Sequence, residues 1–193
     1  MSRLGRYEKV VILAMLATGL VTASMTMAVA PRAFAQAAVS AAAQLSSTES
    51  IQPTDTAPVV VTMNSNDYIN AGVTHSNTSN TGDVVVNEPG AYLIVAAGQV
   101  GKTSGNNTTC NVDLWLRQND KDVANSNTRA SVISTNDTIV LVSQAILLLN
   151  KGDKINTMVS VSATDQGCGL INTAPAGEPD IPAIIFSIAR IGD

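Results

Sequence analysis

Few residues in this sequence could support chemistry. The first candidate is a Gly- and Lys-containing segment that could bind phosphate. Residues 96–103 read AAGQVGKT, which fits the loose phosphate-loop pattern with Ala at its first position. That loop holds phosphate only where a helix follows it, because the amides at the helix N-terminus bind the anion. Here residues 104–109 (SGNNTT) form a polar loop leading toward another strand. The context therefore argues against nucleotide binding.

Acid–base and nucleophilic chemistry would depend on a single histidine, His75. It lies in a polar segment with no Cys or His at ligand spacing, so neither a zinc site nor a general base is indicated. No Ser/His/Asp set and no nucleophile elbow can be assembled around it. A paired-carboxylate site, which a glycoside hydrolase needs, is not indicated either. We therefore expect a non-catalytic protein without a cofactor.

Four carboxylates leave a calcium site as the alternative to that expectation. Asp113, Asp165, Glu178 and Asp180 could gather at loop ends and supply oxygen ligands. Scattered surface carboxylates are the simpler interpretation. The tripeptide Lys151-Gly152-Asp153 resembles integrin-binding motifs, but a tight turn with Gly at the permissive position explains it fully.

The first 35 residues have the layout of a signal peptide. Three basic residues between positions 3 and 9 precede an uncharged run over residues 10–30, and an A-x-A cleavage motif ends at Ala35, before Gln36. The run is also long enough, at about 20 residues, to span a bilayer, so an uncleaved anchor is the alternative. In both cases the folded part is expected to be secreted or at the cell surface. After cleavage, no membrane insertion is expected.

Composition narrows the fold and the partners. Removing residues 1–35 leaves 7 basic and 14 acidic residues, a net charge of −7 against −4 for the whole chain. An acidic exported body repels phosphates, so we expect no nucleic-acid partner and no anionic membrane partner. Hydrophobic residues make up 45% of the chain and aromatics only 3%. A core built from Val, Ile, Leu and Ala, rich in β-branched residues, favours an all-β fold.

Two segments separate the signal from the expected strands. Residues 36–57 are rich in Ala, Ser and Thr and are predicted to be a linker, or a short helix over Ala37 to Leu45. The domain is predicted to cover residues 58–193. Its segment from Asn64 to Gly82 is expected to be an exposed loop with at most weak pairing.

About eight short strands follow, and five of them are of two kinds. Residues 91–101, 138–149 and 181–191 are apolar on both alternating faces, whereas residues 111–118 and 154–163 alternate apolar with polar. Turn signals separate them, Pro89-Gly90 among them. No helical pattern intervenes, which points to an antiparallel sandwich.

Three short motifs in this order resemble the globular heads of complement C-one-q and relatives of tumour necrosis factor. Pro89-Gly90-Ala91-Tyr92 is similar to the PG-x-Y that opens a central strand of those domains. Leu149-x-x-Gly152-Asp153 before Ile155 is similar to their L-x-x-GD-x-V, and Ile185 to Ile188 lies where they end on an apolar strand. The resemblance covers about residues 58–193, without the family's usual aromatics or the collagen-like stalk of many members. It implies a jelly-roll β-sandwich of two antiparallel sheets.

The resemblance also implies a homotrimer in which the inner sheet forms the subunit interface. The three strands that are apolar on both faces correspond to C, F and H of that inner sheet. A monomeric sandwich needs only one apolar face per sheet, so the excess predicts burial between subunits. We expect the interface on those strands, at Tyr92, Ile94, Leu147, Leu149, Ile184, Phe186 and Ile188.

The same placement bears on the two cysteines. In an oxidising compartment Cys110 and Cys168 could pair. The alternating strands correspond to D and G, which are neighbours, so Cys110 at the start of D and Cys168 after G would lie at one end of the outer sheet. The resemblance thus makes a disulfide geometrically reasonable.

Taken together, the sequence predicts an exported trimeric jelly-roll module for protein or glycan recognition or adhesion. Its ligand would be bound by surface loops such as Asn64 to Gly82 and Asp165 to Asp180. A structural subunit of an extracellular coat, matrix or appendage is the first alternative. A carbohydrate-active enzyme is the second.

Overall fold

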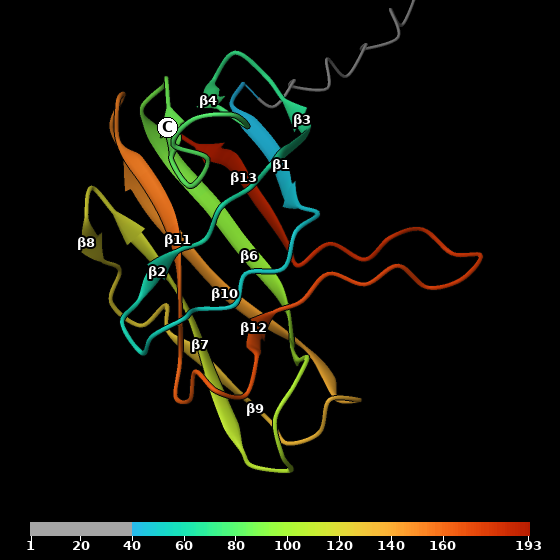
Figure 1. Cartoon of the computed structure of the whole chain (residues 1–193). Coiled ribbons are helices and arrows are strands. Elements are labelled where there is room, and N and C mark those ends of the chain that lie inside the picture. Colours follow the sequence, from blue (N-terminus) through green and yellow to red (C-terminus); the bar gives the residue numbers. More distant parts are fainter. Residues whose placement is uncertain (1–39) are drawn as a thin grey trace, which may run out of the picture. The chain divides into compact units, whose positions relative to one another are not determined.

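The computed structural model describes residues 40–193, which form two antiparallel sheets packed face to face (Figure 1). The predicted signal peptide and its cleavage site lie outside the described residues. In the described part of the chain no helix is long and apolar enough to cross a membrane.

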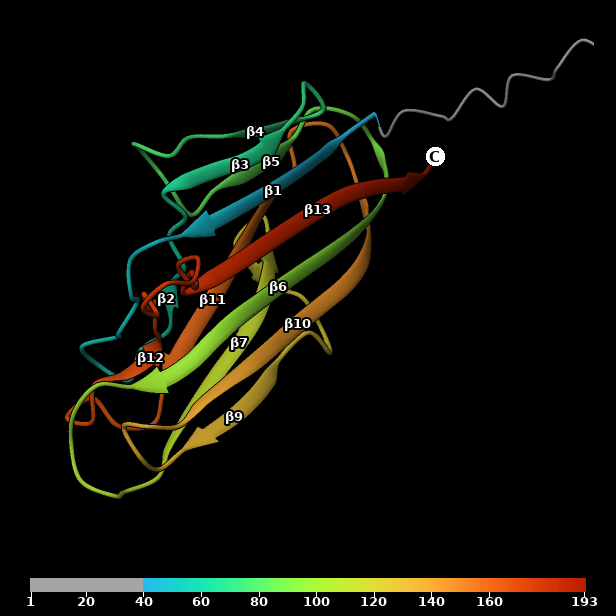
Figure 2. The same ribbon diagram turned by 90° about the vertical axis from the view of Figure 1, so that its right-hand side faces the viewer.

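One sheet has six strands and lies in front in Figure 2. Its order is β10-β6-β13-β1-β3, and β12 also pairs with β6. The long strands are antiparallel neighbours, so their side chains share two faces. The bounds are β1 (Ala42–Ser47), β3 (Ser65–Ile69), β6 (Gly90–Lys102), β10 (Thr138–Leu149), β12 (Cys168–Leu170) and β13 (Ile184–Gly192).

The other sheet has seven strands and lies behind it. Its order is β4-β5-β11-β7-β8, with β2 on β11 and β9 on β7. The pairing of β11 with β7 confirms that the two alternating strands are neighbours. The bounds are β2 (Val59–Val60), β4 (Val73–His75), β5 (Val84–Val86), β7 (Cys110–Gln118), β8 (Lys121–Asp122), β9 (Thr128–Val132) and β11 (Lys154–Val161).

The chain changes sheets at Pro89-Gly90, between β5 and β6. Gly90 has φ of 152°, and a Cβ there would overlap the Arg190 side chain and the carbonyl of Gly192. Only glycine therefore suits this crossing. The Tyr92 hydroxyl donates to the Glu88 carbonyl across it, at 2.8 Å. Burial of the ring raises the pKa of that phenol.

The predicted linker or helix over residues 36–57 is wrong for the segment that forms β1. Ala43 and Leu45 alternate inward and are buried beside Ile188 and Phe186 of β13, their register partners. Alanine is a good helix former, but helix propensity is a weak determinant of structure, and pairing with the free sheet edge beside β13 outweighs it. The sandwich therefore begins before residue 58.

The predicted loop from Asn64 to Gly82 is also partly wrong, because it contains β3 and β4. β3 pairs with β1, and β4 pairs with β5. The polar composition of β3 hid it, since its burial is slight throughout. Outside the strands, this segment contains only Asn64, the turn between β3 and β4, and residues 76–82.

The disulfide between Cys110 and Cys168 is confirmed, with Cα atoms 6.6 Å apart. Its position differs from the expectation in one respect. Cys168 starts β12, which pairs with Lys102 to Val100 of β6, so the bond joins the two sheets instead of closing one end of the outer sheet. The bridge thus fixes β12 against both layers of the sandwich.

Candidate functional site

The feature that distinguishes this sandwich is an exposed apolar side on its six-stranded sheet. We call it the apolar face: the outward side of β10, β6 and β13. Leu148 is 78% exposed, and Val140 and Ile146 are each 67% exposed. None of the residues that point outward from these three strands is charged. Its large exposed members include Leu93, Val140, Val142, Ile146, Leu148 and Ile185.

Strand register assembles these side chains into rows. Ile146 of β10 lies opposite Leu93 of β6, which lies opposite Ala189 of β13. A second row joins Val142 to Ala97. From Val140 to Leu148 the face is about 26 Å long, and three strands make it about 14 Å wide. An apolar patch of this size is typical of an interaction site.

The residues predicted to form the subunit interface mostly lie on the opposite side of the same strands. Tyr92, Ile94 and Phe186 have no exposed surface, and three more are at most 2% exposed. The three further residues are Leu149, Ile184 and Ile188. All six side chains fill the core between the two sheets of one protomer, so their assignment to the interface is corrected.

The cause of this error is the strand pattern itself. When both alternating sets of side chains are apolar, periodicity does not say which set faces the second sheet. The difference in size gives a partial signal, because the buried set of β6 contains Tyr92 whereas its outward set contains Ala91 and Ala97. On β10 that signal fails, since Ile146 and Leu148 are larger than inward Ala145.

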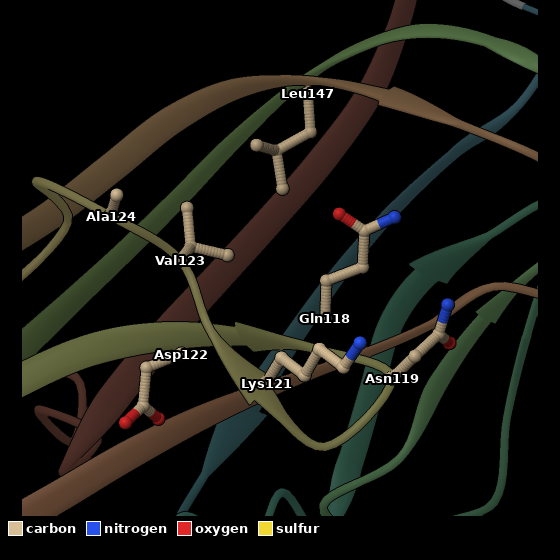
Figure 3. A pocket seen from close by; sticks show the side chains of 7 residues that line it. All are labelled: Gln118, Asn119, Lys121, Asp122, Val123, Ala124 and Leu147. Carbon is tan, nitrogen blue, oxygen red and sulfur yellow. The ribbon is translucent and has the colours of Figure 1, made fainter.

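Leu147, the remaining predicted interface residue, points inward at the open flank of the sandwich. It lines a depression of about 390 Å³ together with residues of the β7–β8 turn (Figure 3). Val123 and Leu147 provide its apolar part. On its rim, Gln118 and Asn119 already donate to the carboxylate of Asp153, at 2.9 and 2.8 Å. The depression offers no set of groups arranged for catalysis.

Lys102, at the end of the phosphate-loop-like stretch, has a structural environment. It is 3% exposed, and its Nζ donates to the carbonyls of Asn106, Thr108 and Ile133 at 2.7, 3.2 and 3.3 Å. It also donates to Gln166 Oε1 at 2.9 Å. With these contacts the ammonium joins three loops. No donor remains for a phosphate, and a strand rather than a helix follows.

His75 is likewise fully engaged. It is 8% exposed, Nδ1 lies 2.6 Å from Asn66 Oδ1, and Nε2 lies 3.0 Å from the Thr81 carbonyl. Both ring nitrogens therefore hold β4 to its neighbours. A histidine with both nitrogens bonded to protein groups lacks a free position for a substrate or a metal.

The carboxylates are separated, and five of those in residues 40–193 form ion pairs. Arg129 forms a two-pronged ion pair with Asp113, at 2.8 and 2.9 Å. Hydrogen bonds from Trp115 and Arg117 hold the pKa of Asp122 below its usual value. In residues 40–193, no three His, Cys, Asp or Glu side chains are grouped so that they could hold a metal ion. The four candidate calcium ligands are not brought together.

The Lys151-Gly152-Asp153 turn is also a structural feature. Gly152 has φ of 91° and nothing near its Cβ position, as a turn tip requires. Asp153 accepts from the Asn150 amide at 2.9 Å and from the side chains of Asn119 and Gln118. These three donors, the Asn150 amide first, hold the pKa of the Asp153 carboxyl below its usual value. The carboxylate is therefore not presented for recognition.

Comparison with known proteins supports the fold. The chain is similar to the crystal structure of murine APRIL at pH 5.0, a jelly roll of the tumour necrosis factor family. The TM-score is 0.50 at 11% identity, over 78% of this chain and 98% of that one. At this identity the likeness shows the jelly-roll fold and nothing further. No family model matches the chain, and no curated protein matches it.

Proposed function

We propose that this protein is an exported, trimeric jelly-roll module that binds a protein or glycan through its surface loops and does no catalysis. The single observation that carries the proposal is the apolar face. A sandwich that exposes Ile146 at 67% and Leu148 at 78%, with no charge on the same side, requires a partner surface. A closed ring of like copies covers such a face on every subunit.

Export is supported by two independent features. The first 35 residues have the order of a signal peptide. The Cys110–Cys168 disulfide belongs to an oxidising compartment such as the outside of the cell.

Recognition rather than chemistry is supported by how the polar residues are used. Lys102, His75 and Asp153 each stabilise a loop or turn, and none is left free beside a pocket. Loops held on a rigid sandwich commonly bind ligands. The loop over residues 76–82 is rich in Asn, Ser and Thr, and its exposed part, residues 77–80, is suited to hydrogen bonding with a glycan or a peptide.

The proposal is tested by presenting the exported protein to a glycan array and a protein array. We expect specific binding that is lost when residues 77–81 are replaced by a short Gly-Ser loop, with no change in oligomeric mass. Assembly into large particles without specific binding would favour a structural subunit of a coat or matrix. Hydrolysis of a glycan that a single carboxylate substitution abolishes would favour a carbohydrate-active enzyme.

A further inference from the structure

A long loop projects from the sandwich on the same side as the apolar face. We call it the arm: residues 172–182, between β12 and β13. In Figure 1 it extends to the right, away from β6 and β13, and in Figure 2 it points toward the viewer, in front of the six-stranded sheet. It leaves the sheet at the end where β13 begins.

The base of the arm is held rigidly. The chain enters the arm at Ile171, whose amide donates to the Gln99 carbonyl at 2.8 Å. It leaves the arm at Ala183, whose carbonyl accepts from the Gln99 amide at 2.9 Å. The Gln99 side chain also donates to the carbonyl of Ile171 at 2.8 Å. One residue of β6 thus fixes both limbs.

The lower part of the arm is also paired with itself. Thr173 and Ile181 exchange two backbone hydrogen bonds of 3.0 and 2.8 Å. Pro175 and Pro179 restrict the backbone beyond this bridge. At the tip, Gly177 has φ of 80° and nothing within 4 Å of its Cβ position. The arm is a self-paired projection that is open to solvent around Gly177 at its tip.

The arm is long enough to reach a second copy that packs on the apolar face. Four residues from Thr173 to Gly177 extend about 13 Å, whereas packed sheets lie about 10 Å apart. If a second copy packs on the apolar face, the arm therefore extends beyond the interface and lies along the side of that copy. In a cyclic assembly whose axis follows the strands, every copy has the same height, so the arm meets the corresponding end of its neighbour.

That end of the neighbour exposes an apolar patch. Val140 is the register partner of Gln99, so β10 begins at the level of the arm base. There Ile133 is 48% exposed, Ile139 is 43% exposed and Val140 is 67% exposed. Ile139 points toward the second sheet, unlike Val140, and is open to solvent because it lies at the start of β10, the edge strand of its sheet. We call these three residues the flank patch.

We propose that the arm of each copy packs on the flank patch of the next copy and clasps the subunits together. Among the exposed side chains of the arm, Ala174, Ala176 and Ile181 are small or apolar and fit this role, whereas Glu178 and Asp180 are acidic. This inference depends on the trimer proposed above, but it assigns the arm to subunit contact. Residues 76–82 then remain as the loop for an external ligand.

The test places the photo-crosslinking residue p-benzoylphenylalanine at position 178 in the exported full-length chain. We expect cross-linked dimers on reducing gels, with the probe attached to the tryptic peptide covering residues 130–151, which contains the flank patch. The matched control carries the probe at Thr56, an exposed position beside the seven-stranded sheet, and should not label that peptide.

Three outcomes are distinguishable. Cross-links between copies at residues 130–151 support the clasp. An oligomer whose probe at 178 labels only its own chain, or only other peptides, overturns the clasp and leaves the trimer intact. A chain that is monomeric at micromolar concentration overturns both proposals.

A second variant tests the contribution of the arm to assembly. Replacing residues 174–180 with Asn-Gly gives a two-residue hairpin turn after Thr173. We expect the association constant to fall at least about 10-fold, or about 1.4 kcal/mol, while a cooperative urea-unfolding transition shows that the variant folds. An unchanged association constant in the folded variant would overturn the clasp.

Discussion

The Thr157 hydroxyl is buried without a hydrogen bond, alone in this respect among the side chains of residues 40–193. Thr157 lies on β11 between Ile155 and Val159, which are both fully buried. A desolvated hydroxyl that makes no bond costs free energy that a methyl group would not. The Thr157 hydroxyl therefore lowers the stability of the fold relative to a methyl group at the same position.

Thr157→Val should therefore stabilise the fold by about 1 kcal/mol. Urea unfolding at pH 7 measures the change. Thr157→Ser is the matched control, because it keeps the hydroxyl and removes the methyl group, and it should destabilise by about 1 kcal/mol. A valine variant no more stable than the wild type would mean that the hydroxyl has a partner.

Asp153 links stability to pH. Because its folded-state pKa is depressed, the carboxylate adds stability at pH values above its unfolded pKa. That stability is lost as the pH falls through the folded pKa. Asp153→Asn should cost about 1 kcal/mol at pH 7, and the difference from wild type should shrink below about pH 4.

Unfolding midpoints from pH 2 to pH 7 measure this dependence. Asp120→Asn is the control, since Asp120 is 76% exposed and its ion pair with Lys154 should contribute little. A penalty for Asp153→Asn that stays constant down to pH 2 would contradict the role given to the three donors.

At the scale of elements, the disulfide determines how firmly β12 and the arm beyond it are held. Cys110 and Cys168 are 58 residues apart in sequence, and the bond joins strands of different sheets. Replacing both with Ala should destabilise the fold by up to about 4 kcal/mol, the chain-entropy value for a loop of this length. Amide exchange should rise first in residues 166–172.

Thiol labelling of the exported protein checks the bond directly. The denatured, non-reduced chain should contain no reactive thiol, and the reduced chain should contain two. Two labelled thiols without reduction would show that the bond does not form.

The strands of the apolar face give a prediction of their own. Ile146→Lys combined with Leu148→Lys places two charges where a subunit should pack, and should yield a folded monomer. Val60→Lys, an exposed apolar position on the other sheet, should leave the oligomer unchanged. Size-exclusion chromatography with light scattering separates these results. An unaltered oligomer in the double variant would exclude this face as the interface.

The long strands could be predicted from sequence because their apolar runs and turn signals are strong. Residues 138–149 were bounded correctly, and β6 to within one residue at each end. β1 was missed because Ala and Ser carry little β signal, so its pairing with β13 decides its structure. The facing of β6, β10 and β13 could not be predicted, since both alternating sets are apolar and only the second sheet distinguishes them.

The candidate site also contains some features that the sequence predicts and others that depend on tertiary contacts. The pairing of Cys110 with Cys168 could be predicted from the expected oxidising compartment and from the strand placement that the family resemblance implies. The strands of the apolar face could be predicted from their excess of apolar residues. The roles of Lys102 and His75 were not, because their partners come from loops distant in sequence. The sequence of the arm contains Pro and Gly, which predicts a loop. Composition alone does not predict in which direction that loop projects from the sandwich.

At the scale of the whole molecule, the features combine into one scheme. A jelly roll fixed by an inter-sheet disulfide exposes an uncharged apolar face on one layer and polar, ion-paired strands on the other. The asymmetry between the layers is what a subunit of a closed assembly requires. Loops at the rims would then be repeated around the axis, which strengthens binding to a repeated ligand.

The oligomeric mass of residues 36–193 tests the central claim most directly. Sedimentation equilibrium of the exported protein at micromolar concentration should give three times the mass of the protomer, with the double lysine variant at one. A wild-type protein that sediments as a single protomer across that range would contradict the account.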